Sequence, residues 1–293
     1  MSEDRGGLLT FQTTVLTSMA MLAFAANSLL CRLALRQGEI DPVSFAGIRL
    51  ISGAIALAVI VRFRSKRSSP GHTDWLAAAM LFAYVAFFSF AYLTLPAGTG
   101  ALILFGAVQL TMFSVGLRSG EKFGAIAWLG LALAVAGLVY LVSPGVAAPP
   151  LLGAALMAIA GVAWGVYSLR GRGVADPLAA TAGNFARAAP LALLLSLLFL
   201  ANSHAHARAA GVILAIASGA ITSGIGYVIW YAALSKLSSM RAATVQLSVP
   251  LIAAFGGVAF LSEAITPRLG AASAAILGGI AMVLTSRSQR PRT

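Results

Sequence analysis

The segment FGAIAWLGLALAVAGLVYLVS, residues 123–143, carries no charged side chain at any position. An α-helix of about 20 mostly apolar residues crosses the hydrocarbon core of a bilayer. The whole chain shares this character, because 59% of its 293 residues are hydrophobic and only 10% are charged. Ordinary soluble domains are about 25% charged, so too few charges remain here to cover a water-soluble globule. The sequence therefore predicts an all-α integral membrane protein.

Ten apolar segments of this kind follow one another along the chain. We expect spanning helices at residues 10–31, 43–61, 75–95, 99–117, 123–143, 151–169, 178–200, 209–233, 242–261 and 269–286. Short connections containing proline and glycine separate them, and none is long enough to fold as a soluble domain. The first segment lacks a small-residue processing site at its end, so it is expected to be a retained helix and not a cleaved signal.

The formal net charge of +12 is explained by membrane topology. Nucleic-acid binding would require a basic stripe with interleaved aromatic residues, and the sequence contains none. If the N-terminus lies inside the cell, 14 Lys and Arg residues fall in cytoplasmic connections and 4 in outer ones. Cytoplasmic loops normally carry this excess. We therefore predict a bacterial inner (plasma) membrane protein with both termini in the cytoplasm.

The two halves of the chain resemble each other. Asp41-Pro42 opens the second segment and Asp176-Pro177 opens the seventh, while Glu121 and Glu263 each close a segment in corresponding positions. Five spans per half is an odd number, so the second half must be inverted in the membrane. We predict two inverted five-helix repeats, residues 1–145 and 146–293. Such repeats are typical of secondary transporters, which bind their substrate near the midplane.

Three stretches resemble the EamA branch of the drug/metabolite transporter superfamily. They are Pro42–Arg49, Gly226–Leu234 and Pro250–Glu263, and the resemblance extends over nearly the whole chain. Val108 departs from the pattern, because it stands where the counterpart of Pro250 is expected. The resemblance implies a basket of two five-helix repeats around a central path. Within the superfamily, the overall likeness is greatest to the YddG-type exporters of aromatic amino acids.

Several polar and aromatic side chains at membrane depth are candidates for contact with a substrate. Charged and amide groups are costly there unless they face a partner or a watery path. The two arginines suit a substrate carboxylate, and the aromatic rings suit a flat apolar side chain. The candidates are Arg49, Arg187, Trp164, Tyr227, Tyr84, Asn27, Asn184, Gln109 and Gln246. Each also has a structural interpretation, as a helix–helix contact or a residue of the membrane interface.

Glycine and proline mark points where helices can bend. Gly224 and Gly226 give the eighth segment a deformable centre, and Pro190 and Pro250 interrupt backbone bonding in the seventh and ninth. We expect hinges for alternating access at these points, with static kinks as the alternative. In the tenth segment, the small residues Gly270, Ala274 and Gly278 favour packing within the monomer over pairing of two protomers.

The acidic residues limit the mechanism. All eight lie outside the interiors of the predicted spans, and the spans contain no His, Asp or Glu. A membrane-embedded enzyme needs such groups, and ion-coupled carriers usually place a carboxylate in the membrane. We therefore expect no enzyme, no metal and no cofactor, and transport by facilitated diffusion or exchange.

The sequence thus predicts a secondary transporter, monomeric or homodimeric, that exports small metabolites by alternating access. Neutral amino acids, including aromatic ones, are the preferred substrates. The alternatives are other metabolites or drugs, or a nucleotide sugar, although a nucleotide-sugar carrier would want more cationic side chains in its cavity. A channel is a further alternative, but no charged ring or filter loop is visible.

Overall fold

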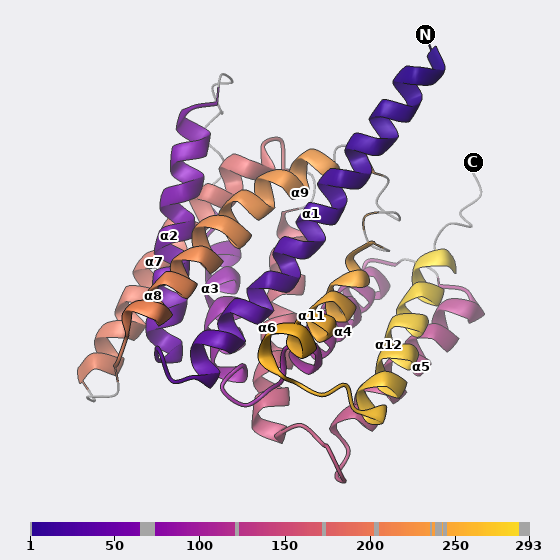
Figure 1. Ribbon diagram of the computed structural model, residues 1–293. Helices are drawn as coiled ribbons and strands as arrows, with labels where there is room; N and C mark the ends of the chain where they lie inside the picture. Colours follow the sequence, from indigo (N-terminus) through magenta and orange to yellow (C-terminus); the bar gives the residue numbers. More distant parts are fainter. Residues whose placement is uncertain are drawn as a thin grey trace.

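The computed structural model describes residues 2–64, 74–120, 123–171, 174–201, 205–234, 236–237, 242 and 245–286. Among these residues all regular secondary structure is helical, apart from an isolated antiparallel bridge between Ile40 and Ala207. The helices, shown in Figure 1, are α1 (Ser2–Arg36), α2 (Pro42–Arg62), α3 (Trp75–Ala91), α4 (Ala97–Arg118), α5 (Ala125–Val142), α6 (Leu151–Arg170), α7 (Pro177–Ala201), α8 (Ala209–Ile216), the π-helix η1 (Ala217–Ile225), α9 (Gly226–Leu234), α11 (Ser248–Leu261) and α12 (Pro267–Ser286).

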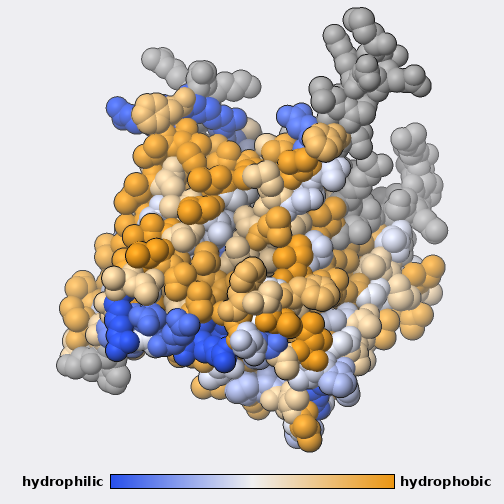
Figure 2. Space-filling view, viewed as in Figure 1, coloured by the Kyte–Doolittle hydropathy of each residue, from blue (hydrophilic) through white to orange (hydrophobic). Residues whose placement is uncertain are grey.

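The predicted all-α membrane architecture is confirmed. Among the described residues, eight helices are long and apolar enough to cross a membrane, and α3 and α11 are shorter apolar helices. α8, η1 and α9 form one continuous run, Ala209–Leu234, which corresponds to the predicted eighth span. Figure 2 shows the matching surface, a broad hydrophobic band between hydrophilic patches at its upper and lower edges. This band is the surface that lipid tails would cover.

The largest differences from the predicted boundaries are at the starts of two helices. α1 begins at Ser2, well before the apolar segment predicted from residue 10. α11 begins at Ser248 and not at residue 242, so Pro250 lies in its first turn. A proline in the first turn removes no intrahelical hydrogen bond, because those amides have no partner within the helix. Pro190, in contrast, lies inside α7 as predicted.

The two Asp-Pro pairs start their helices in the same way. The Asp41 carboxylate accepts hydrogen bonds from the amides of Val43 and Ser44 at 3.0 and 2.9 Å. The Asp176 carboxylate accepts from the Ala179 amide at 3.1 Å. In both cases proline occupies the first helical position, where its missing amide costs nothing. The sequence match between the halves therefore reflects a shared local structure.

The helix packing is also matched between the halves. α5 packs on α12, α2 on α7 and α4 on α11, and each pair joins helices of equal rank in the two halves. The contact of α3 with α6 corresponds to that of α1 with η1 and α9, and the contact of α4 with α6 corresponds to that of α1 with α11. An exchange of the two halves would reproduce this set of neighbours. The other sequence match, Glu121 with Glu263, involves Glu121, which lies outside the described residues.

The expected monomer packing of the small-residue stripe on α12 is wrong. Gly270, Ala274 and Gly278 are exposed, and a Cβ added at either glycine would meet nothing within 4 Å. Gly279 is the residue that packs closely, with its carbonyl against Gly130 of α5. The seam between α5 and α12 therefore runs one position away from the predicted stripe.

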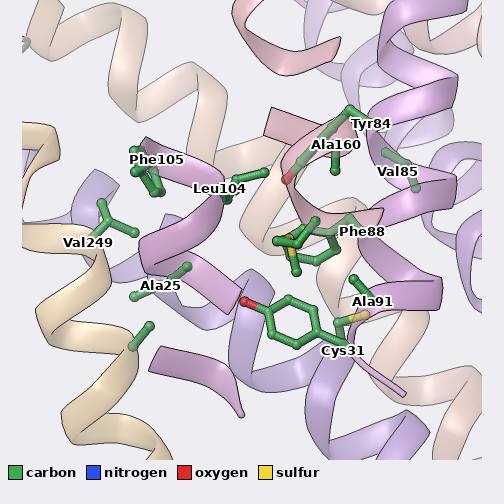
Figure 3. Packing of buried hydrophobic residues seen from close by; sticks show 14 of the residues in the cluster. Ala25, Cys31, Tyr84, Val85, Phe88, Ala91, Leu104, Phe105, Ala160 and Val249 are labelled. Atoms are coloured by element: carbon green, nitrogen blue, oxygen red, sulfur yellow. The ribbon is translucent and has the colours of Figure 1, made fainter. Parts of the chain in front are cut away.

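The bundle has two ends, which we name for use below. The terminal face holds the start of α1 and the ends of α2, α6 and α12 (Figure 1). The opposite face holds the segments between α1 and α2, α3 and α4, and α11 and α12. Between them lies a continuous buried core, in which Tyr84 and Phe88 of α3 lie near Ala160 of α6 (Figure 3).

Candidate substrate cavity

A cavity of about 970 Å³ lies among α1, α3, α4, α6, α7 and α9. Its lining extends from the deep residues Trp164 and Tyr227 to Asp74, Arg170 and Gly171 at the terminal face. No lining residue comes from the described segments of the opposite face. The cavity is therefore open toward the terminal face and blocked toward the opposite one. A volume in this range suits a small organic molecule.

Aromatic rings form the wall of the cavity. Trp164 and Tyr227 are stacked, with ring centroids 5.8 Å apart, and Tyr227 is also stacked with Tyr231 at 6.4 Å. Tyr167 lies 5.3 Å from Trp164, one turn farther along α6. Phe24 of α1 contacts Tyr227 at 5.9 Å. Such rings offer flat apolar surfaces at spacings that suit a further aromatic or apolar group.

Away from its mouth, the polar groups that line the cavity are neutral. Gln109, Asn184, Gln246 and Thr181 lie among the rings. The Thr181 hydroxyl lies 2.8 Å from that of Tyr231, which links α7 to α9 across the cavity. Amides and hydroxyls can donate and accept hydrogen bonds without the cost of burying a net charge. The interior of the cavity therefore favours neutral ligands with polar ends.

Two ion pairs lie at the terminal face, and the residues of the first, Arg170 and Asp74, line the mouth of the cavity. Arg170 Nε lies 2.6 Å from Asp74 Oδ2, and Arg64 Nη1 lies 3.1 Å from Asp176 Oδ1. Desolvation of Asp74 opposes its ionisation, but hydrogen bonds from Arg170 and the Ala77 amide outweigh it and lower the pKa of this carboxyl. Asp74 therefore stays ionised at neutral pH, and it holds the start of α3 to the end of α6.

The opposite face is closed by a cluster around Arg32, which we call the outer latch: Arg32, Glu263, and the backbone of Tyr92, Leu93 and Ala97. Arg32 Nε lies 3.1 Å from Glu263 Oε1, and its Nη1 donates to the carbonyls of Tyr92 and Leu93 at 2.9 Å each. The Ala97 amide donates to Glu263 Oε2 at 2.8 Å. The latch therefore joins α1, the end of α3, the start of α4 and the end of α11.

The glycine-containing centre of the eighth span is a π-helix. Gly224 lies within η1 and Gly226 starts α9 directly after it. Three hydroxyls of η1 donate to a single acceptor, Asn27 Oδ1 of α1; they belong to Ser218, Thr222 and Ser223. π-Helical turns are rare and occur often at functional sites. The Asn27 amide thus anchors this widened turn to the other half of the molecule.

Arg49 lies deeper than the cavity, behind the rings of Tyr84 and Trp164. Its guanidinium carbon is 5.3 Å from the ring centroid of Tyr84, and the Tyr84 ring is 4.8 Å from that of the cavity residue Trp164. Arg49 is 1% exposed, and it donates to Ser223 Oγ of η1 at 3.3 Å and to Tyr84 Oη at 3.2 Å. The guanidinium therefore connects α2, α3 and η1 behind the aromatic wall.

The structure brings together most of the predicted substrate residues. Gln109, Trp164, Asn184, Tyr227 and Gln246 all line the cavity. The other four do not border it. Arg49 and Tyr84 form the layer behind the wall, Asn27 anchors η1, and Arg187 is half-buried on α7, alongside Gly183 of its own helix. Substrate contact by any of the nine stays a prediction.

Several lining residues were not among the predicted substrate residues. Trp230 and Tyr231 share a helix face with Tyr227, and Tyr167 follows Trp164 by three positions. Residues three and four apart lie on the same face of a helix, so this spacing could have indicated them once Trp164 and Tyr227 were chosen. The same spacing relates Met112 to Gln109 and Phe24 to Asn27, but Asn27 itself does not line the cavity, so the spacing alone does not select the lining residues of α1.

Comparison with protein families gives two matches to the EamA-like transporter family, over residues 13–143 and 151–285. An uncharacterised protein of Pseudomonas aeruginosa is 52% identical over 279 residues, covering 95% of this chain and 96% of its own length. Transporters without an assigned substrate from Archaeoglobus fulgidus and Bacillus subtilis (YoaV) are 27% and 23% identical; each match covers 86% of this chain and 90% of the relative.

A solved structure titled only as the crystal structure of a protein has the same fold. It is 20% identical, with a TM-score of 0.66, and the match covers 94% of this chain and 98% of that one. At this identity the likeness shows the fold alone. The family description and two of the relatives' names describe transporters and not enzymes. With two family matches that together cover most of its length, this membrane protein belongs to the EamA-like transporter family of the drug/metabolite transporter superfamily.

Proposed function

We propose that this membrane transporter exports small neutral metabolites, with neutral amino acids, aromatic ones included, as its preferred substrates. The observation that carries the proposal is the cavity of about 970 Å³ with the rings of Trp164, Tyr227 and Tyr231 on its wall. A flat apolar side chain can pack against such rings, and the amides of Gln109 and Asn184 can hydrogen-bond its polar end.

Transport by alternating access accounts for the two ends of the bundle. The cavity is open at the terminal face and the outer latch closes the opposite face. Residues 1–145 and 146–293 act as the two inverted repeats, and their matched packing supports this division. An outward-open state then requires that the latch separate and that the rings near the terminal face close over the cavity.

Facilitated diffusion or exchange follows from the charges. Among the described residues that line the cavity, Asp74 is the one carboxylate, and it is paired with Arg170 at the mouth. A proton- or sodium-coupled carrier usually needs an acidic side chain that responds to the ion within the membrane. The proposed transporter therefore needs no ion gradient. It resides in the inner membrane with both termini in the cytoplasm, as a monomer or homodimer.

Counterflow in proteoliposomes tests this function. Vesicles loaded with unlabelled phenylalanine should accumulate labelled phenylalanine, and an imposed pH gradient should leave the rate unchanged. Empty vesicles and vesicles with an unrelated membrane protein are the controls. A rate that follows the pH gradient would contradict facilitated transport. Absence of counterflow with every neutral amino acid would refute the substrate class, and drugs and nucleotide sugars would then be compared.

A further inference from the structure

The Arg49 guanidinium contains a buried donor with no acceptor. Arg49 Nη1 is the buried side-chain atom without a hydrogen-bond partner among the described residues. The two bonds that the guanidinium does make, to Ser223 and Tyr84, are 3.3 and 3.2 Å long and go to neutral hydroxyls. Buried polar atoms nearly always have a partner, and leaving one without costs about 1–3 kcal/mol.

The positive charge of Arg49 also lacks a counter-ion. The described carboxylates lie at helix ends, in the segments between helices or at the cavity mouth, and those within 4 Å of a cation pair with Arg32, Arg64 or Arg170. The rings of Tyr84 and Phe88 lie 5.3 and 5.0 Å from the guanidinium carbon and stabilise it by cation–π contact. The N–H groups of a guanidinium lie in its plane, and an anion accepts hydrogen bonds from them more strongly than a ring face does. The donors of Arg49 are therefore not all matched by acceptors.

The rings of Tyr84 and Trp164 separate this guanidinium from the cavity. The Tyr84 ring lies between Arg49 and Trp164, and Trp164 borders the cavity. The Tyr84 hydroxyl is held by a single bond to Arg49 Nη2. Rotation of this side chain together with a shift of Trp164 would therefore open a path from the cavity to Nη1 and Nη2, while Nε would keep its bond to Ser223.

We propose that Arg49 is the binding site for the carboxylate of the transported molecule, which displaces the Tyr84 hydroxyl. A carboxylate would bind Nη1 and Nη2 together, replacing one long neutral bond with two charge-assisted ones. The ligand class is an organic molecule with one carboxylate, of which a neutral amino acid is an example, whose apolar part packs against Trp164 and Tyr227. The proposal rests on the proposed function in one respect, that the substrate occupies this cavity.

This position would also couple the ligand to the moving parts. Arg49 joins α2 to α3 through Tyr84 and to the π-helix η1 through Ser223. Ser223 belongs in turn to the set of hydroxyls held by Asn27 of α1. An anion bound here would meet the helices of both halves at one point, which is where a ligand can favour one packing of the halves over another.

Binding to the purified protein tests the site without transport. The probes are 3-phenylpropionate and 3-phenylpropanol, which have the same ring and differ in the carboxylate, with Kd taken from the ligand dependence of Tm. The wild type should prefer the carboxylate, and Arg49→Gln should reduce that preference about 10- to 100-fold. Arg62→Gln, on the exposed end of the same helix, should retain it. Tyr84→Phe should tighten carboxylate binding, because the competing hydroxyl is gone.

Three results would overturn the proposal: equal affinity of the wild type for both probes, an unchanged preference in Arg49→Gln, or weaker carboxylate binding in Tyr84→Phe. If Arg49→Gln does not fold, Arg49→Lys keeps the charge without the planar fork and should still lower the preference. Carboxylate preference at Arg49 together with no amino acid counterflow would refute the proposed substrate and leave this site standing. The two proposals can therefore fail separately.

Discussion

Trp164 lies between the cavity and Tyr84, which contacts the buried Arg49. Its ring contacts Tyr84 on one side, and Tyr227 and Tyr167 on the other. Each aromatic pair of this kind contributes about 0.5–1.5 kcal/mol beyond the area it buries. We expect Trp164→Ala to weaken binding of an aromatic ligand by about 2- to 10-fold. Titration of the purified variant checks this, with Trp75→Ala, an exposed residue at the start of α3, as control. Equal affinities in the variant and the wild type would remove Trp164 from the site.

The Asp74–Arg170 pair should contribute the same stability over a range of pH. The pKa of Asp74 lies below the ordinary value of 3.8, because hydrogen bonds from Arg170 and Ala77 outweigh the effect of desolvation. A lowered pKa contributes stability above the ordinary value, and this contribution is lost as the pH falls through the lowered one. Acidification from neutral pH to about 5 should therefore leave the pair intact. The expected result is an unchanged difference in Tm between wild type and Asp74→Asn over that range. A difference that shrinks on acidification would show that the pair titrates there.

At the scale of elements, the outer latch determines which face is closed. Glu263→Gln keeps the shape of the side chain but removes the charge that pairs with Arg32. Both side chains are about one-tenth exposed, so the loss should matter more than at a solvated surface pair. We expect the outward-open state to become more populated. A cysteine placed at Thr181 in the cavity should then react faster with a reagent applied from outside. Arg64→Gln, in the exposed ion pair at the terminal face, is the matched control and should not increase this rate. An unchanged rate in Glu263→Gln would contradict the role of the latch.

The close contact of α2 with η1 depends on a glycine. A Cβ at Gly219 would overlap Ser52 Oγ and the Arg49 carbonyl, so this glycine permits the close approach of the two helices. Gly219→Ala should destabilise the protein by about 1–3 kcal/mol through overpacking. Thermal unfolding measures the effect. Gly270→Ala on α12 is the control, because its added Cβ meets nothing within 4 Å. A loss of stability as large in Gly270→Ala would attribute the effect to the helix backbone and not to packing.

The whole molecule has two faces whose sides of the membrane can be assigned by labelling. Val146 lies on the connection between α5 and α6 at the opposite face and is 95% exposed, and Phe63 at the terminal face is 82% exposed. In a Cys31→Ser background, Val146→Cys should react with an impermeant thiol reagent in intact cells, and Phe63→Cys only after permeabilisation. The excess of Lys and Arg at the terminal face is the physical reason. The reverse labelling pattern would place the termini outside.

The membrane class, the helices and several of their starts can be predicted from the sequence. These depend on local properties: the apolar length that spans a bilayer, and an Asp-Pro pair that caps and opens a helix. The structure has the π-helix η1 at the glycine-rich stretch of Gly224 and Gly226, and the role of this stretch as a hinge stays a prediction. Helix type and ends can be read along one chain.

Which side chains meet depends on how the helices pack, and this could not be predicted from the sequence. Arg32 and Glu263 form the outer latch although 231 positions separate them, and Arg49 faces Ser223 from 174 positions away. Because of the rotation of each helix about its axis, Phe24 and Met112 line the cavity, whereas Arg187 lies alongside its own helix. The sequence does not reveal these rotations, because the faces of a membrane helix are almost equally apolar. Its hydrophobicity then shows little periodicity from which the inward face could be predicted.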